Sequence, residues 1–245
     1  MKRIVKTLVL AVISAALFQG CATPKLSGPP DVMFKEGEQS FQKGRYEDAI
    51  AQWKKVKESY QSPELSTRAE LNIADAYFLN KDFIEAASAY EDFRKLHPRH
   101  ERAGYALYRQ AMSHFNQIHS VDTDQTPVKN ALLTFQSYLT LYPAGEHLGE
   151  ATEKIGACRD KQLQYEIYVG NFYLKTGKYP AAIGRFEEAL KAFPGLSGRD
   201  EVLYLLGRAY QKSDQQAKAV EAYERLVKEY PASAFAGDAR KVLGK

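Results

Sequence analysis

The chain has 245 residues, 44% of them hydrophobic and 26% charged, which is typical of a globular protein. Its 34 Lys and Arg outnumber its 30 Asp and Glu, but Lys2, Arg3 and Lys6 precede the first apolar run. The rest of the chain carries 31 basic and 30 acidic residues, so it lacks the positive excess that nucleic acid phosphates attract. We therefore expect no nucleic acid partner.

Residues 1–20 have the order of a secretory signal peptide. Positive charge comes first, followed by the apolar run LVLAVISAALF at 8–18 and then by the small Gly20. The run has eleven residues, whereas about 20 are needed to cross a bilayer. A transmembrane helix is therefore the weaker interpretation.

Gly20 and Cys21 resemble the cleavage point of a bacterial lipoprotein, where a small residue precedes the cysteine that receives a diacylglycerol. Phe18 and Gln19 depart from that pattern, which usually has an aliphatic residue and then a small one at these places. We expect Cys21 to carry the diacylglycerol and an N-acyl chain, including palmitate, and to anchor the protein to a membrane, with no other cofactor. Ala22 is not the aspartate that retains such lipoproteins in the inner membrane, so we expect the periplasmic face of the outer membrane.

Cys158 is the one other cysteine of the chain. With Cys21 acylated, an internal disulfide is excluded, although the compartment is oxidising. We interpret Cys158 as a small buried residue rather than a reactive thiol.

A pattern of twenty residues recurs after a spacer rich in proline and glycine. Each copy starts with a small residue and has alanine at its thirteenth place and an aromatic residue at its seventeenth, and the copies begin at Gly37, Ala74, Gly170 and Gly207. This is the tetratricopeptide pattern, in which small residues let two helices approach and the aromatic side chain fills the space further along. Those aromatic residues are Trp53, Tyr90, Phe186 and Tyr223. Prolines at 98, 194 and 231 lie where each second helix should end.

A degenerate third repeat lies between these copies, with RAGYALYRQAMSHF as its first helix and VKNALLTFQSYLTLYP as its second. The polar segment NQIHSVDTDQTP between them predicts a protruding loop. From Gly149 to Tyr173 the sequence has no proline and has apolar residues at helical spacing, which predicts one long linking helix.

The sequence thus predicts an all-α, right-handed tetratricopeptide-repeat solenoid of about five helix pairs, with the long linking helix and a short C-terminal capping helix at 234–243. We expect a signal peptide at 1–20 and a lipidated N-terminus with a flexible spacer at 21–32. Repeats 1–3 occupy 33–145, and the long helix, repeats 4 and 5 and the capping helix occupy 146–245.

Several segments together resemble the BamD family, the lipoprotein subunit of the outer-membrane β-barrel assembly machinery. They are the lipoprotein signal, YALYRQAM, DTDQTPVKNALLTFQSYLTLYPAGEH and YEIYVGNFYLKTGKYPAAIGRFE. The resemblance covers the whole mature chain. It implies a scaffold that binds the barrel subunit BamA through C-terminal repeats, works beside other assembly lipoproteins, and receives unfolded outer-membrane proteins in its N-terminal repeats.

Helix geometry suggests which side chains form the substrate groove. First helices line the concave face of such a solenoid, and their outward positions recur three and four residues apart. The candidates are Glu38, Phe41, Arg68, Leu71, Asp75, Phe78, Arg102, Tyr105 and Arg109. Core packing is an equal alternative for the aromatic residues, and a solvated face is the alternative for the arginines. Three arginines on one groove nevertheless suit a peptide carboxylate.

Three residues are candidates for contact with partner subunits. Arg185 interrupts an otherwise apolar helix and aligns with an arginine of BamD proteins. Asp122 and Asp124 lie in the inserted loop.

We find no pattern that indicates an enzyme or a metal site. SFQK at 40–43 and KTG at 175–177 imitate motifs of serine penicillin-binding proteins, but no Ser-Asp-Asn lies between them and both fall in repeats. The five histidines have no His-Glu-x-x-His spacing, and Cys-x-x-Cys does not occur.

Other periplasmic repeat lipoproteins are the alternative function. Tol-Pal-linked cell-division proteins usually have an N-terminal coiled coil and a Gly/Ser-rich linker, whereas here about a dozen residues separate Cys21 from the first repeat. Lipoproteins of pilus and secretin assembly stay open, because their anchors look the same.

Overall fold

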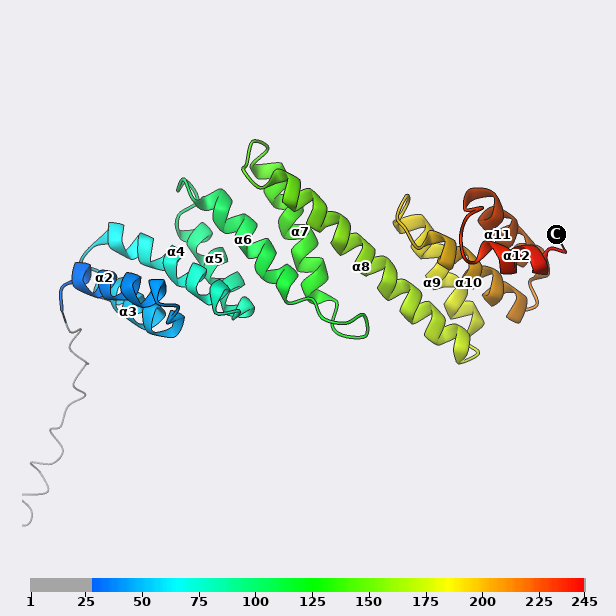
Figure 1. The fold of residues 1–245 in the computed structure, drawn as a ribbon, viewed down its shortest axis with the longest axis horizontal. Coiled ribbons are helices and arrows are strands. Elements are labelled where there is room, and N and C mark those ends of the chain that lie inside the picture. Colours follow the sequence, from blue (N-terminus) through cyan, green and yellow to red (C-terminus); the bar gives the residue numbers. More distant parts are fainter. Residues whose placement is uncertain (1–27, 245) are drawn as a thin grey trace, which may run out of the picture. The chain divides into compact units, whose positions relative to one another are not determined.

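The computed structural model describes residues 28–244, which form eleven helices and no strand (Figure 1). The prediction of an all-α tetratricopeptide-repeat fold is confirmed. The predicted signal peptide and Cys21 lie outside the described residues, so the signal peptide, its cleavage and the lipidation stay predictions. Within 28–244, every helix is too short or too polar to cross a membrane.

The chain divides into two compact units, one ending at Asn72 and the other beginning at Ile73. The boundary falls inside α4 (Pro63–Leu79). The expected division at 145/146 is of another kind, because it separates the repeats expected to bind substrate from those expected to bind a partner. It stays a prediction.

The first unit contains α2 (Pro30–Gln42), α3 (Tyr46–Ser59) and the beginning of α4. Helix α2 begins inside the expected spacer. Pro29 is extended, with φ −63° and ψ 148°, and Pro30 takes the first helical position. Proline is favourable there because the first turn needs no N–H donor and φ is already helical. The ProPro dipeptide is therefore a helix start rather than part of the linker.

Gly37 and Trp53 hold the first helix pair together. A Cβ atom on Gly37 would lie 2.4 Å from Nε1 of Trp53, so only glycine permits this approach. The indole N–H of Trp53 donates a hydrogen bond to the carbonyl of Phe34 at 3.1 Å. The predicted pairing of a small residue with an aromatic one is confirmed here.

The second unit contains the rest of α4 and eight further helices. They are α5 (Phe83–Leu96), α6 (Ala103–Asn116), α7 (Thr126–Leu141), α8 (Leu148–Lys175), α9 (Tyr179–Ala192), α10 (Arg199–Lys212), α11 (Gln216–Glu229) and α12 (Ala236–Val242). From α5 onward, each helix packs against the next along the chain. The second helices α5, α7, α9 and α11 each end two residues before a proline, as predicted.

Helix α8 joins two hydrophobic cores of this unit, lying between α7 and α9 (Figure 1). Its first half contributes Ala151 and Cys158 to a core shared with α6 and α7. Its second half contributes Leu163 and Leu174 to the core of α9 to α12. At 1.5 Å per residue, its 28 residues extend over about 42 Å. The predicted long linking helix is confirmed.

Cys158 is buried without exposed surface, as predicted. Burial raises the pKa of its thiol to about 11, because the thiolate loses its hydration. The thiol is therefore protonated at neutral pH and packs as a small apolar group.

The predicted loop of the third repeat is also confirmed. Residues 117–125 contain turns but no helix, and α7 starts at Thr126.

Candidate functional site

Asp75 lies at the centre of a cluster formed by α4, α5 and α6. Its Oδ1 atom accepts hydrogen bonds from the hydroxyls of Tyr90, at 2.5 Å, and Tyr105, at 2.8 Å. Arg109 donates through Nε to the Tyr90 hydroxyl oxygen at 3.3 Å. We call Asp75, Phe78, Tyr90, Tyr105 and Arg109 the Asp75 cluster.

Two arginines stack on aromatic rings, Arg109 within α6 and Arg102 directly before it. The Arg109 guanidinium lies 3.6 Å from the centre of the Phe78 ring. Arg102, at the start of α6, is exposed and lies 4.0 Å from the centre of the Tyr105 ring. Stacking fixes the plane of each guanidinium and leaves its edge available for hydrogen bonds.

Burial controls the protonation of the cluster. It raises the pKa of Tyr105 to about 12, and the charge of Asp75 contributes to the same shift. Burial raises the pKa of Tyr90 further still, again with a contribution from Asp75. Both phenols are therefore protonated at physiological pH and donate to the carboxylate, which fixes the two rings relative to α4.

The cluster offers fixed positive charge beside aromatic surface. Arg102 and Arg109 can donate paired hydrogen bonds to a carboxylate, while Phe78 and Tyr105 are half-buried and keep some ring surface exposed. The arrangement suits reversible binding of a peptide that carries both a carboxylate and an aromatic side chain.

Five of the predicted groove residues meet here: Asp75, Phe78, Arg102, Tyr105 and Arg109. Tyr90 was not among the predicted groove residues, because the repeat pattern indicates only core packing for it. The ring of Tyr90 is indeed buried, but its hydroxyl joins the polar network.

The other four groove candidates lie in the first unit. Glu38 and Arg68 form an ion pair at 3.5 Å with both side chains partly exposed. Phe41 packs against Trp53, with ring centres 5.6 Å apart, which favours the core-packing alternative for this residue. Leu71 is only 9% exposed and offers little surface to a peptide.

A second surface is a hollow of about 530 Å³ beside α8, which we call the interface hollow. Its lining comes from the inserted loop, α7, α8 and the region of α9: Thr123, Asp124, Gln125, Thr126, Lys129, Gln162, Tyr165, Glu166, Arg185 and Phe193. Two of the three predicted partner residues, Asp124 and Arg185, thus line the same hollow. The third, Asp122, is exposed in the inserted loop and does not line the interface hollow. Its carboxylate accepts a hydrogen bond from the Ser120 hydroxyl at 2.6 Å.

Local hydrogen bonds fix the charged groups of the interface hollow. Arg185 Nη1 donates to Glu166 Oε2 at 3.1 Å, and this bond raises the pKa of the guanidinium. Asp124 accepts from the backbone N–H of Thr126 at 2.9 Å and from its hydroxyl at 2.8 Å. These bonds lower the pKa of Asp124 and satisfy a donor at the start of α7.

The motifs that imitate penicillin-binding proteins have no catalytic geometry. Ser40 is buried in α2, and Lys175 is the last residue of α8. Gly177 lies in the turn that follows, with φ +75°. Between residues 28 and 244, no group of three or more His, Cys, Asp or Glu side chains is placed to hold a metal ion.

Comparison with known proteins decides the family. The YfiO family, described as outer membrane lipoprotein, matches residues 27–224. The chain belongs to this family.

The resemblance to the BamD family is also confirmed, because curated relatives carry the name outer membrane protein assembly factor BamD. The Caulobacter vibrioides protein is 30% identical to this YfiO-family chain over 209 residues, covering 82% of this chain and 68% of its own. The Rickettsia prowazekii protein is 27% identical over 235 residues, covering 94% of both chains.

Solved structures similar to this YfiO-family member include the TPR2AB-domain:pHSP90-complex of yeast Sti1. It covers 87% of this chain and 84% of its own, with 14% sequence identity and a TM-score of 0.46.

Proposed function

We propose that this chain is an assembly factor for outer membrane proteins, held at the periplasmic face of the outer membrane by lipid on Cys21. Membership of the YfiO family and the names of its curated relatives support this role. The protein works by binding, as a scaffold between unfolded substrates and the barrel subunit of the machinery.

The Asp75 cluster, together with Arg102, receives unfolded segments of outer membrane proteins. A barrel strand before insertion has unpaired backbone groups and exposed aromatic side chains. A surface with guanidinium groups stacked on aromatic rings can hold such a segment reversibly without folding it. The observation that carries this proposal is the 3.6 Å stacking of Arg109 on Phe78, beside tyrosines fixed by Asp75.

The interface hollow receives the BamA-type barrel subunit. Arg185 and Glu166 present a partly exposed ion pair there, with side chains 43% and 21% exposed. A charged group of the partner can compete for either side chain at little cost, because exposed ion pairs contribute only about 0–1 kcal/mol. The inserted loop supplies a further wall through Asp124.

Binding of a labelled peptide tests the substrate surface. The probe is a fluorescein-labelled peptide with alternating polar and apolar residues and a C-terminal phenylalanine carboxylate, compared with the same peptide as a C-terminal amide. We expect the carboxylate peptide to bind about tenfold tighter, since a charge-assisted hydrogen bond contributes about 1.5–3 kcal/mol. Equal affinity for both peptides contradicts the proposal.

Two matched charge reversals locate that binding. Arg102→Glu should abolish the preference for the carboxylate. Arg99→Glu, at an exposed position just before α6, should retain it. If Arg102→Glu binds the carboxylate peptide as tightly as the wild type, the Asp75 cluster together with Arg102 is not the substrate surface.

Copurification tests the partner surface. Arg185→Glu places a second carboxylate against Glu166, so we expect less of the barrel subunit to copurify with the variant. Lys212→Glu, an exposed charge reversal at the end of α10, is the control and should change nothing. Unchanged copurification with Arg185→Glu removes Arg185 from the interface.

A further inference from the structure

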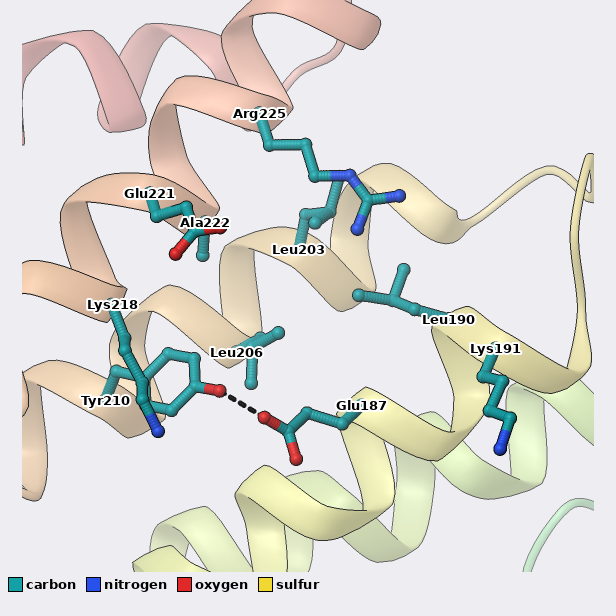
Figure 2. Close-up of a pocket in the computed structure, with 10 residues that line it drawn as sticks. All are labelled: Glu187, Leu190, Lys191, Leu203, Leu206, Tyr210, Lys218, Glu221, Ala222 and Arg225. Atoms are coloured by element: carbon teal, nitrogen blue, oxygen red, sulfur yellow. Dashed lines mark hydrogen bonds between the residues drawn. The ribbon is translucent and has the colours of Figure 1, made fainter.

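The exposed side of α7 is uncharged, unlike the exposed sides of α9 and α11. Residues 130–145, which form most of α7 and the turn after it, include no Asp, Glu, Lys, Arg or His. Because 26% of the chain is charged, a stretch of this length would be expected to carry about four such residues. On α9 and α11, by contrast, Figure 2 shows charged side chains around a hollow of about 460 Å³, and the exposed ones are Glu187, Lys191, Lys218, Glu221 and Arg225.

Two leucines on this side of α7 are exposed to solvent. Leu133 is 61% exposed and Leu141 is 59% exposed, and Ser137 is four residues from each, which places all three on one side of the helix. Gln136 and Thr140 are exposed beside them. We call Leu133, Gln136, Ser137, Thr140 and Leu141 the α7 outer face. A single exposed leucine is ordinary on a protein surface, but here no charged residue lies between the two.

The hydroxyl groups of the α7 outer face are already bonded within the helix. Ser137 Oγ donates to the carbonyl of Leu133 at 2.9 Å, and Thr140 Oγ1 donates to the carbonyl of Gln136 at 2.9 Å. A partner that covers these hydroxyls therefore leaves neither donor unpaired, which is the usual cost of burying a polar group. Gln136 lies about 100° around the helix from Ser137, so its amide can stay at the wet edge. The face thus accepts hydrocarbon at little electrostatic cost.

The α7 outer face is too small to be a stable interface by itself. The 16 residues of α7 are about 24 Å long and about 10 Å wide, which gives a footprint of roughly 240 Å². A stable association between two proteins, including two copies of this chain, buries about 800 Å² on each of them. A partner that covers this face must therefore contact a neighbouring surface as well.

The interface hollow supplies that neighbouring surface. Thr126 and Lys129, within the first four residues of α7, line the hollow. Leu133 follows Lys129 by four residues, so the α7 outer face begins one turn beyond the hollow. A partner seated in the interface hollow thus reaches the α7 outer face along a single helix.

We propose that the α7 outer face is a second contact for the partner that occupies the interface hollow, and that it receives an uncharged, aliphatic surface of this partner. The inference rests on the proposed function of the hollow and adds the chemistry of the contact to it. A charged group of the partner placed against Leu133 or Leu141 would lose its hydration and find no opposite charge within 130–145. The charged part of the contact is confined to the hollow, where Arg185 and Glu166 lie.

Photocrosslinking in intact cells tests the inference on the full-length, membrane-attached protein. p-Benzoylphenylalanine, which attaches to nearby C–H bonds on irradiation, replaces either Tyr165 in the interface hollow or Leu141 on the α7 outer face. Mass spectrometry then identifies the attached protein and the attached segment. We expect the same protein at both positions, and at position 141 an aliphatic segment without charged residues. Leu96 of α5, which is 60% exposed, is the control position and should give less than a fifth of that product.

Matched substitutions measure the contact by copurification of the protein that attaches at position 165. Leu133→Glu and Leu141→Glu should each lower its recovery at least fivefold. Leu96→Glu makes the same change at an equally exposed leucine and should leave the recovery within twofold. All three leucines lie outside the core, so the variants should fold, which a thermal unfolding curve checks.

Three results would overturn the inference. They are no attached protein at position 141, attachment there to lipid or to a second copy of this chain, and unchanged copurification in both α7 variants. A barrel subunit attached at position 165 alone would overturn the inference and leave the proposed function in place. One protein attached at both positions that is not a barrel subunit would support the inference and contradict the proposed function.

Discussion

Tyr105 couples the stability of the fold to pH, because partial burial of its phenol and the nearby charge of Asp75 raise the pKa of that phenol. The pKa of this phenol rises from 10.0 in the unfolded chain to about 12 in the folded one. Above pH 10 the unfolded chain loses this proton while the folded chain keeps it, so the free energy of unfolding falls as pH rises toward 12.

Phenylalanine at position 105 removes this titration. We expect the free energy of unfolding of Tyr105→Phe to fall less between pH 9 and 11.5 than that of the wild type. Urea unfolding at several pH values measures the two slopes, which are compared because the variant also lacks one hydrogen bond at every pH. Identical slopes would mean that Tyr105 does not titrate in this range.

At Gly207, close packing requires glycine although alanine is the better helix former. A Cβ atom here would lie 2.6 Å from Cε1 of Tyr223, inside the core. We expect Gly207→Ala to lower the free energy of unfolding by about 1–3 kcal/mol through overpacking, although alanine is the better helix former.

Gly184 supplies the matched control. It lies in α9, and a Cβ atom added to it would have no neighbour within 4 Å, so Gly184→Ala should stabilise the protein by about 0.5–1 kcal/mol. Chemical denaturation of both variants checks the pair. If both variants lose stability, or if neither does, the close packing of Gly207 against the Tyr223 ring does not explain the effect of the substitution.

At the scale of elements, α8 carries the connection between two hydrophobic cores. Gln164 is exposed near its middle. Proline at this position removes a backbone donor and clashes with the preceding turn, which costs about 3 kcal/mol or more. We expect Gln164→Pro to separate the unfolding of the two cores into two transitions in calorimetry. Gln164→Ala should show the same number of unfolding transitions as the wild type. A single transition for the proline variant would show that an intact α8 is not what makes the two cores unfold together.

The helices and their pairing could be predicted from the sequence because they follow a local period. The glycines at 37, 170 and 207 and the aromatic residues sixteen places later are forced by close packing within one repeat. The prolines mark helix ends for an equally local reason. The start of α2 was misplaced because a ProPro pair fits both a linker and a first helical turn.

Contacts between repeats could not be predicted in this way. Arg199 is buried, and its Nη1 donates to the carbonyls of Leu190 and Phe193 at 2.6 and 2.8 Å, which closes the end of α9. Nothing in the repeat period distinguishes it from an exposed arginine. In the same way, the sequence indicated Asp124 and Arg185 as two separate candidates, and only the folded structure shows that both line one hollow.

At the scale of the whole molecule, the proposed role needs attachment to the membrane. Two or three acyl chains on Cys21 would make release negligible, since each buried methylene contributes about 0.8 kcal/mol. We expect radioactive palmitate to label the wild-type protein and not Cys21→Ser, which should also appear in the soluble fraction. Equal label in both proteins would show that Cys21 is not the site of lipid attachment.

The role in assembly is tested most directly by the proteins that accompany this chain. The measurement is gentle detergent extraction of outer membranes, capture through a C-terminal tag, and mass spectrometry of what is retained. We predict a stoichiometric outer-membrane barrel subunit with repeated periplasmic domains, together with further lipoproteins. Recovery of a secretin or of cell-division proteins instead would leave the fold intact and contradict the proposed function.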